Sequence, residues 1–357
     1  MHHARIAGMG HYVPDNVVTN DDLAAVMDTS DAWIRERTGI EERRYATKSE
    51  QTTATLGAEA ARRACAAAGI APAEIDFIVF ATLSPDYYFP GCGVLVQREL
   101  GITDTECGAL DVRNQCSGFI YGLSVAEKFV AAGMYRNVLV VGAEMHSMGL
   151  DYSTAGRGVT VIFGDGAGAA ILQPTDGDGG AGVLASALHA DGTYAEKLAM
   201  LSPGSHGGKH LRAQGDERDW GFAPQEDYGG IFATQAMLDN GDFYPVMEGQ
   251  FVFKLAVQKF PEVIQEVLAE AGLSVADIDV LIPHQANLRI AQFVQRTLKL
   301  SDEQVYNNIQ RYGNTTAASV PIALSEAVAE GRVKRGDVVV LAAFGSGFTW
   351  GGVALRW

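Results

Sequence analysis

The residue best suited to covalent chemistry in this chain is the cysteine at position 116. It follows a short apolar strand pattern and stands where a helix should begin, and Ser117 and Gly118 leave room for other groups to approach. A helix N-terminus carries unpaired N–H groups and about half a positive charge, so we expect the Cys116 thiol to ionise easily and act as a nucleophile. A buried structural cysteine would give the same local pattern, because free cysteine is among the most buried residue types.

Two further polar residues follow predicted strands in the second half of the chain. His284 comes directly after the apolar run 280–282, and Asn314 lies in a Gly-Asn turn before a helix. Because ligands of open α/β sheets bind at the carboxyl ends of the strands, Cys116, His284 and Asn314 should lie at one edge, with the glycine-rich turn 344–348. Taken singly, the histidine could be a hydrogen-bonded structural residue and the asparagine a turn former.

The elements that must position these residues alternate between helix and strand patterns. Strand-like runs such as 77–81 are continuously apolar, which predicts a mostly parallel sheet covered on both faces. The stretch 68–79 is repeated at 271–282, with helix end, glycine, turn and strand in the same order. We therefore predict a duplicated α/β unit, with the cysteine in a half at 1–175 and the histidine and asparagine in a half at 176–357.

Residues 201–246 break this alternating pattern. The segment is rich in Gly, Asp, Gln and aromatic residues. Long insertions in compact domains are usually functional loops, so we expect a lid or a wall of the substrate cavity here.

The composition excludes several classes of function. The 357 residues are 47% apolar and carry a net charge of −16, which describes a globular protein and argues against binding to nucleic acid or to anionic membranes. The four cysteines form no CxxC pair and complete no zinc pattern, so we expect no metal site and a reducing, cytoplasmic setting. No apolar run reaches the roughly 18 residues that span a bilayer, and the N-terminal residues lack the apolar core of a signal peptide.

Several motifs together resemble those of the thiolase-fold condensing enzymes, most closely the ketoacyl-acyl-carrier-protein synthase III family. They are the elbow around Cys116, HQAN at 284–287, YGNTTAAS at 312–319 and AFGSGFTWGG at 343–352. The similarity extends to WIRERTGIEERR near the start and FGDGAGAAIL at mid-chain. The resemblance implies a thiolase-like α/β fold, in which duplicated βαβαβ halves form a five-layered α-β-α-β-α arrangement.

The resemblance also implies a reaction. Cys116, His284 and Asn314 would form a catalytic triad for the decarboxylative condensation of an acyl-CoA with malonyl-acyl-carrier protein, a step of fatty acid biosynthesis. Cys116 would carry the acyl group, and backbone N–H groups of Cys116, Ser346 and Gly347 would hold the oxyanion. The product would be a 3-oxoacyl thioester, and no cofactor would be needed because acyl-CoA is itself a substrate.

The binding residues are assigned by the same matching. Trp33 and Arg37 would sandwich the adenine of CoA, and Phe89 would close the acyl pocket across a homodimer interface. The other residues expected to contact CoA or the substrate are Arg157, Gly249, Phe253, Asn287 and Phe344. Exposed basic residues near the tunnel mouth would bind the acidic carrier protein, namely Lys254, Arg289, Arg296 and Lys299.

The chain departs from the family pattern in two places. Asn114, Gln115 and Ser117 are more polar than the usual neighbours of the cysteine, and the segment 201–246 is longer than in compact relatives. Both lie where the acyl chain is chosen, so its length and branching stay open. An acyltransferase of the same fold, acting on a non-malonyl acceptor in secondary metabolism, is the alternative function. Retention of Asn314 favours condensation, and the intact triad argues against a non-catalytic carrier-binding subunit.

Overall fold

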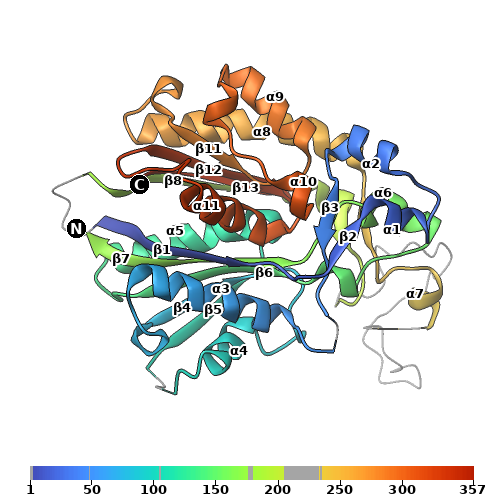
Figure 1. Cartoon of the computed structure of the whole chain (residues 1–357), viewed down its shortest axis with the longest axis horizontal. Helices are drawn as coiled ribbons and strands as arrows, with labels where there is room; N and C mark the ends of the chain where they lie inside the picture. Colours follow the sequence, from blue (N-terminus) through green and yellow to red (C-terminus); the bar gives the residue numbers. More distant parts are fainter. Residues whose placement is uncertain (1–2, 48, 104–105, 176–179, 205–232, 234) are drawn as a thin grey trace.

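Two mixed β-sheets form the frame of the computed structural model, which describes residues 3–47, 49–103, 106–175, 180–204, 233 and 235–357 (Figure 1). The first sheet runs in the order β1 (His3–Tyr12), β7 (Gly166–Thr175), β6 (Val138–Glu144), β4 (Phe77–Ala81) and β5 (Gly108–Val112). The second runs in the order β11 (Val280–Pro283), β12 (Val338–Gly345), β13 (Thr349–Arg356) and β8 (Gly182–Ala190).

Three helix layers cover these sheets. The central layer, between the two sheets, holds α5 (Gly118–Ala131) and α11 (Ser319–Ala329). The outer face of the first sheet is covered by α3 (Thr53–Ala68) and α4 (Cys92–Glu99), and that of the second by α8 (Gly249–Glu270) and α9 (Leu288–Leu298). The three large buried apolar clusters fill the spaces between these layers. The expected five-layered α-β-α-β-α arrangement is therefore present.

The expectation of mostly parallel sheets is wrong. β4 pairs in parallel with β5 and β6, and β11 pairs in parallel with β12, but the remaining neighbours in both sheets are antiparallel. The parallel neighbours are joined by helical crossovers. In contrast, β13 follows β12 after a short turn at 346–348, and such a turn can join only antiparallel strands.

The internal repeat is visible element by element. Gly69 after α3 and Gly272 after α8 adopt φ of 71° and 70°, a conformation that costs glycine little. Each is followed by a 3-10 turn, at Pro72–Glu74 or Val275–Asp277, and then by a buried strand, β4 or β11. The division of the chain near residue 175 remains a prediction.

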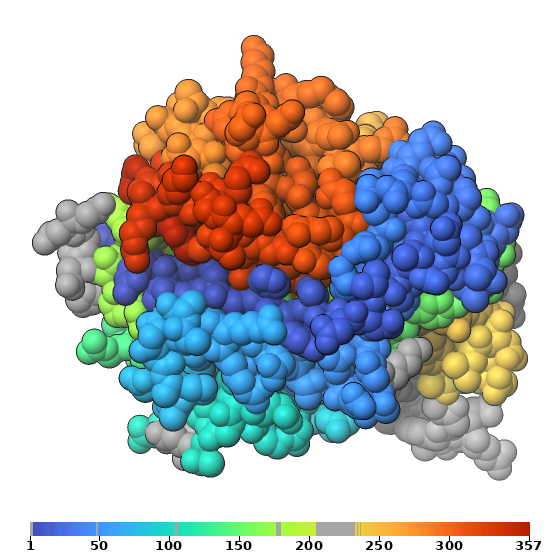
Figure 2. Space-filling view, in the orientation of Figure 1, coloured from blue at the N-terminus to red at the C-terminus, as the bar shows by residue number. Residues whose placement is uncertain are grey.

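Smaller elements gather at one end of the molecule (Figure 1). They are β2 (Val17–Thr19), α1 (Asn20–Ala24), α2 (Asp31–Thr38), β3 (Glu42–Arg44), α6 (Arg157–Thr160), β9 (Leu198–Met200), α7 (Gln235–Asp239), β10 (Pro245–Met247) and α10 (Ile309–Tyr312). Figure 2 shows the blue segment that contains α1 and α2 beside the orange second half of the chain, where α2 contacts α9.

Most of the 201–246 segment lies outside the described residues, and the prediction of a lid falls there. Of the helices that the structure does describe, none has the length and apolar character to span a bilayer.

Candidate active site

Cys116 lies in a tight elbow between β5 and α5. It is the middle residue of a 3-10 turn, Gln115–Ser117, and the Cys116 residue is 7% exposed. Gln115 before it has φ of 46°, which non-glycine residues rarely adopt. Gly345 at the end of β12 packs directly on the cysteine, since a Cβ built on it would lie 2.9 Å from the Cys116 sulfur. The end of β12 in the second sheet therefore lies against Cys116, which follows β5 of the first sheet.

Two backbone N–H groups face the Cys116 thiol closely enough to favour its ionised form, those of Ser346 and of Cys116 itself. Both favour the thiolate, but burial outweighs them and raises the pKa of Cys116 to about 12, with the negative charge of Glu144 adding to the rise. The expectation that the helix N-terminus makes this thiol ionise easily is therefore wrong, because burial outweighs the N–H groups. The same N–H groups are placed to hold an oxyanion at this sulfur.

Glu144 is a fully buried carboxyl at the end of β6. It accepts hydrogen bonds from the hydroxyls of Thr82 and Ser84 and from the backbone N–H groups of Leu83 and Ser84. Burial raises the pKa of Glu144 to about 7, although these donors act in the opposite direction. Glu144 was not among the residues predicted from the sequence, although its place at the carboxyl end of an apolar strand was a usable signal.

His284 follows β11 and presents one free ring nitrogen. Its Nδ1 lies 2.6 Å from the hydroxyl oxygen of Ser319, whereas its buried Nε2 has no hydrogen-bond partner among the described residues. Burial lowers the pKa of His284 to about 3, so the ring is neutral at physiological pH. A neutral imidazole with an unpartnered nitrogen is suited to donate a hydrogen bond to a substrate.

Asn314 is held so that its amide nitrogen is available. Gly313 before it has φ of 63°, and the Asn314 backbone pairs with Ile162 and Gly164. The side-chain oxygen accepts a hydrogen bond of 2.8 Å from the Thr316 backbone N–H, which leaves the amide NH₂ as the group that can donate.

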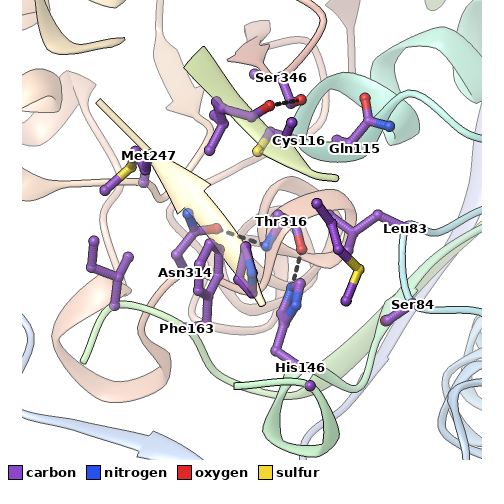
Figure 3. A pocket seen from close by; sticks show the side chains of 18 of the residues that line it. Leu83, Ser84, Gln115, Cys116, His146, Phe163, Met247, Asn314, Thr316 and Ser346 are labelled. Carbon is purple, nitrogen blue, oxygen red and sulfur yellow. Dashed lines mark hydrogen bonds between the residues drawn. The ribbon is translucent and has the colours of Figure 1, made fainter. Parts of the chain in front are cut away.

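A buried histidine supports this wall of the cavity. The Nε2 of His146 pairs with the hydroxyl of Thr316, and the His146 ring packs 4.7 Å from that of Phe163. Burial lowers the pKa of His146 to about 3. Figure 3 shows the hydrogen bonds that link Asn314, Thr316 and His146 on one side of the cavity, with Cys116 on the other. Neither Thr316 nor His146 was singled out from the sequence.

Two family models match the regions that carry these groups. The model described as 3-oxoacyl-[acyl-carrier-protein (ACP)] synthase III matches residues 110–192, and that of its C-terminal part matches residues 268–357. A curated beta-ketoacyl-[acyl-carrier-protein] synthase III from Xanthomonas campestris pv. campestris is 44% identical over 355 residues, covering 99% of this chain and 98% of that protein. The chain belongs to the beta-ketoacyl-[acyl-carrier-protein] synthase III family.

Solved structures of a synthase III and of a priming β-ketosynthase share the fold. The enzyme from Aquifex aeolicus VF5 is 39% identical with a TM-score of 0.82, and the comparison covers 99% of this chain and 100% of that one. The priming β-ketosynthase of the R1128 polyketide biosynthetic pathway is 32% identical with a TM-score of 0.83, covering 99% and 96%. The resemblance and the thiolase-like fold inferred from the sequence are confirmed.

Most of the predicted synthase III site residues line one cavity of about 1450 Å³. This volume exceeds the roughly 300–1,000 Å³ of ordinary ligand pockets and suits a long substrate. Besides the three triad residues, the predicted residues that line it are Trp33, Arg37, Gly249, Phe253, Asn287, Arg289, Phe344, Ser346 and Gly347. Of the two turn residues expected to hold the oxyanion, Ser346 is the one whose backbone N–H lowers the pKa of the Cys116 thiol.

The two residues expected to sandwich the adenine, Trp33 and Arg37, stack on each other. The Arg37 guanidinium lies 4.4 Å from the centre of the Trp33 ring, and that of Arg157 lies 5.4 Å from it. A base stacked between two groups needs them about 7 Å apart, so a sandwich requires the Arg37 side chain to move. Asn287 caps α9 and donates to the Arg37 carbonyl, so its side-chain amide is already engaged.

Phe89 and three of the four basic residues expected to bind the carrier protein do not line the cavity of a single chain. Phe89 is 81% exposed, in a loop that also exposes Tyr87 and Tyr88. Lys254, Arg289, Arg296 and Lys299 are exposed, and only Arg289 reaches the cavity wall. Within the described part of the chain, no three His, Cys, Asp or Glu side chains are grouped to hold a metal ion.

Proposed function

We propose that this enzyme condenses an acyl-CoA with malonyl-acyl-carrier protein and releases carbon dioxide and a 3-oxoacyl thioester. One observation carries the proposal: a single cavity holds a thiol with two backbone N–H groups, and also two side-chain donors, His284 and Asn314. Hydrolysis or simple acyl transfer needs only the first set of groups, the thiol and the two backbone N–H groups. The second set suits a step that develops negative charge on another thioester oxygen.

In the first half-reaction, Cys116 attacks the thioester carbonyl of the acyl-CoA. The oxyanion is held by the N–H groups of Cys116 and Ser346, the two groups that favour negative charge at the sulfur. The carbon–sulfur bond to CoA breaks, CoA leaves as the thiol after taking up the proton from Cys116, and the acyl group remains on the enzyme.

In the second half-reaction, malonyl-acyl-carrier protein occupies the same cavity. Loss of carbon dioxide leaves an enolate whose oxygen accepts hydrogen bonds from His284 and from the Asn314 amide. Each such donor is typically worth about 2.7–4 kcal/mol of transition-state stabilisation. The enolate carbon attacks the acyl carbonyl, and the Cys116 sulfur leaves and regains a proton. The neutral state of His284 suits this role, because its burial disfavours the imidazolium.

The proposal includes a cytoplasmic homodimer. β5 is an edge strand, Leu110 on it is 38% exposed, and the nearby loop exposes Tyr87, Tyr88 and Phe89. Exposed aromatic side chains beside an open sheet edge favour pairing with a second copy of the chain. In the resulting dimer, Phe89 of one copy would close the acyl pocket of the other. The basic residues around α9 would receive the acidic carrier protein.

Intact-protein mass spectrometry tests this function. The enzyme is mixed with acyl-CoAs of increasing chain length, and malonyl-acyl-carrier protein is then added. We expect a covalent adduct that disappears with formation of the 3-oxoacyl product, and Cys116→Ala should form no adduct. An adduct that persists would favour transfer to a non-malonyl acceptor, and the absence of any adduct would exclude an acyl-CoA donor.

A further inference from the structure

We propose that Ser319 is a positioning residue that fixes the tautomer of His284, so that the proton is carried on Nε2 and points into the cavity. Ser319 is the first residue of α11, packs beneath the histidine and is 2% exposed. The tautomer follows from the hydrogen-bond geometry around Ser319. Its consequence for catalysis rests on the proposed function.

The hydrogen bonds around Ser319 have one consistent arrangement. The Gln285 backbone N–H can only donate, and it lies 3.4 Å from the Ser319 oxygen. The Nδ1 of His284 lies 2.6 Å from the same oxygen. No hydrogen bond from this hydroxyl to a carbonyl is found among the described residues. The Ser319 oxygen therefore accepts from Gln285, and its own hydrogen goes to Nδ1.

The opposite tautomer leaves the pair unsatisfied. With a proton on Nδ1, the Ser319 oxygen would receive two donors, and its own hydrogen would have no acceptor in a buried site. The Nε2 of His284 has no partner among the described residues in either tautomer, so the contacts on the Ser319 side decide between the two. Because the partner of one ring nitrogen decides which nitrogen carries the proton, the serine hydroxyl favours the Nε2–H form.

Gln285 keeps this arrangement rigid. Its side-chain nitrogen donates to the Pro283 carbonyl at 2.6 Å, and its side-chain oxygen accepts from the backbone N–H groups of Asn308 and Ile309. The backbone that donates to Ser319 is therefore anchored to the loop before Asn314. The Thr316 N–H orients the Asn314 amide in the same sense, so that both side chains present a donor to the cavity.

Ser319→Ala removes the hydroxyl, and Ser319→Thr retains it. A matched control lies on the same helix: the Ser325 hydroxyl pairs with Nδ1 of His11 at 2.9 Å, and neither residue lines the active-site cavity. Ser325→Ala therefore deletes the same kind of serine–histidine bond on α11 away from the site.

Two measurements read the effect. Nitrogen-15 NMR of histidine-labelled enzyme, with His284 assigned by the loss of its signals in His284→Ala, reports the tautomer. Single-turnover kinetics separate Cys116 acylation from malonyl decarboxylation. We expect wild-type His284 to be protonated on Nε2, and Ser319→Ala to show both tautomers. Decarboxylation should slow by about 10- to 100-fold, while acylation stays within about twofold. Ser319→Thr and Ser325→Ala should match the wild type.

Protonation of wild-type His284 on Nδ1 would overturn the proposal, as would an unchanged tautomer in Ser319→Ala. An equal loss of acylation and decarboxylation would show a structural role instead. If the wild-type enzyme acylates but never decarboxylates malonyl-acyl-carrier protein, the proposed function fails, and the NMR result still decides the tautomer.

Discussion

Replacement of Gly345 by alanine probes the tightest contact in the active site. The added Cβ would lie 2.5 Å from the Cβ of Cys116, 2.9 Å from its sulfur and 3.2 Å from its nitrogen. Carbon atoms in ordinary contact are roughly 3.5–4.0 Å apart, so the end of β12 and the cysteine elbow would have to separate by about 1 Å. This movement carries the Ser346 N–H away from the thiol.

The size of the effect follows from that displacement. A misplacement of about 1 Å at a reacting centre can slow a reaction by about 10²-fold, which corresponds to roughly 2.7 kcal/mol of lost transition-state stabilisation. We therefore expect Gly345→Ala to slow Cys116 acylation by about 10²-fold. Overpacking should also lower the free energy of unfolding by about 1–3 kcal/mol, which a urea titration measures.

The assay is rapid-quench measurement of CoA release from an acyl-CoA. Gly352→Ala in β13 is the matched control, because its Cβ would approach nothing closer than Val267 at 3.3 Å and would not touch the cysteine. We expect that variant to acylate at the wild-type rate. A Gly345→Ala enzyme that is folded by circular dichroism and releases CoA in a wild-type burst would refute the argument from this contact.

The other predictions concern charge, the enolate donors and the frame of the site. Glu144→Gln should lower the pKa of Cys116. Since the pKa of Glu144 itself is about 7, iodoacetamide should alkylate the variant faster only above about pH 7, where the wild-type carboxyl is charged; identical pH profiles would contradict this. Asn314→Ala should form the acyl-enzyme normally yet decarboxylate malonyl-acyl-carrier protein about 10²- to 10³-fold more slowly, and normal decarboxylation would remove the assigned role. Arg43→Met should lower the free energy of unfolding by about 2–4 kcal/mol, measured by urea titration, because the fully buried guanidinium donates to Asn20 and to two backbone carbonyls. An unchanged midpoint of unfolding would show that these hydrogen bonds contribute nothing to stability.

Local signals in the sequence are enough to predict the repeated unit. The glycines at 69 and 272 end helices in both copies, and the apolar runs after them form strands. Strand direction is not a local property. Whether β13 runs with or against β12 is decided by the short turn between them. The antiparallel strands β7 and β13 are buried along most of their length, and burial on both faces is what gives parallel strands their continuous apolar runs, so the pattern does not reveal the direction.

The chemistry of Cys116 could be predicted only in part. Its place at a helix N-terminus is readable from the sequence and predicts an easily ionised thiol. The groups that reverse this expectation come from other elements, since Gly345 closes over the sulfur from β12 and Glu144 adds a negative charge from β6. The burial of Cys116 depends on how closely the two sheets pack at this point, and the spacing of residues along the chain does not reveal that packing.

The two elbows of the repeat explain how one cavity could serve both half-reactions of the proposed mechanism. Gln115 and Thr316 occupy matching places and have φ of 46° and 43°, so the unusual backbone is kept in both copies. Only the first elbow carries a thiol, and the second has alanine at 317. The second elbow instead provides the Thr316 N–H that orients Asn314 and the Ser319 hydroxyl that binds His284. A condensing enzyme needs a nucleophile and an enolate site facing each other across a few ångströms. In the proposed mechanism, the two strained turns supply one each, so residues from both copies of the repeat are needed to form the site.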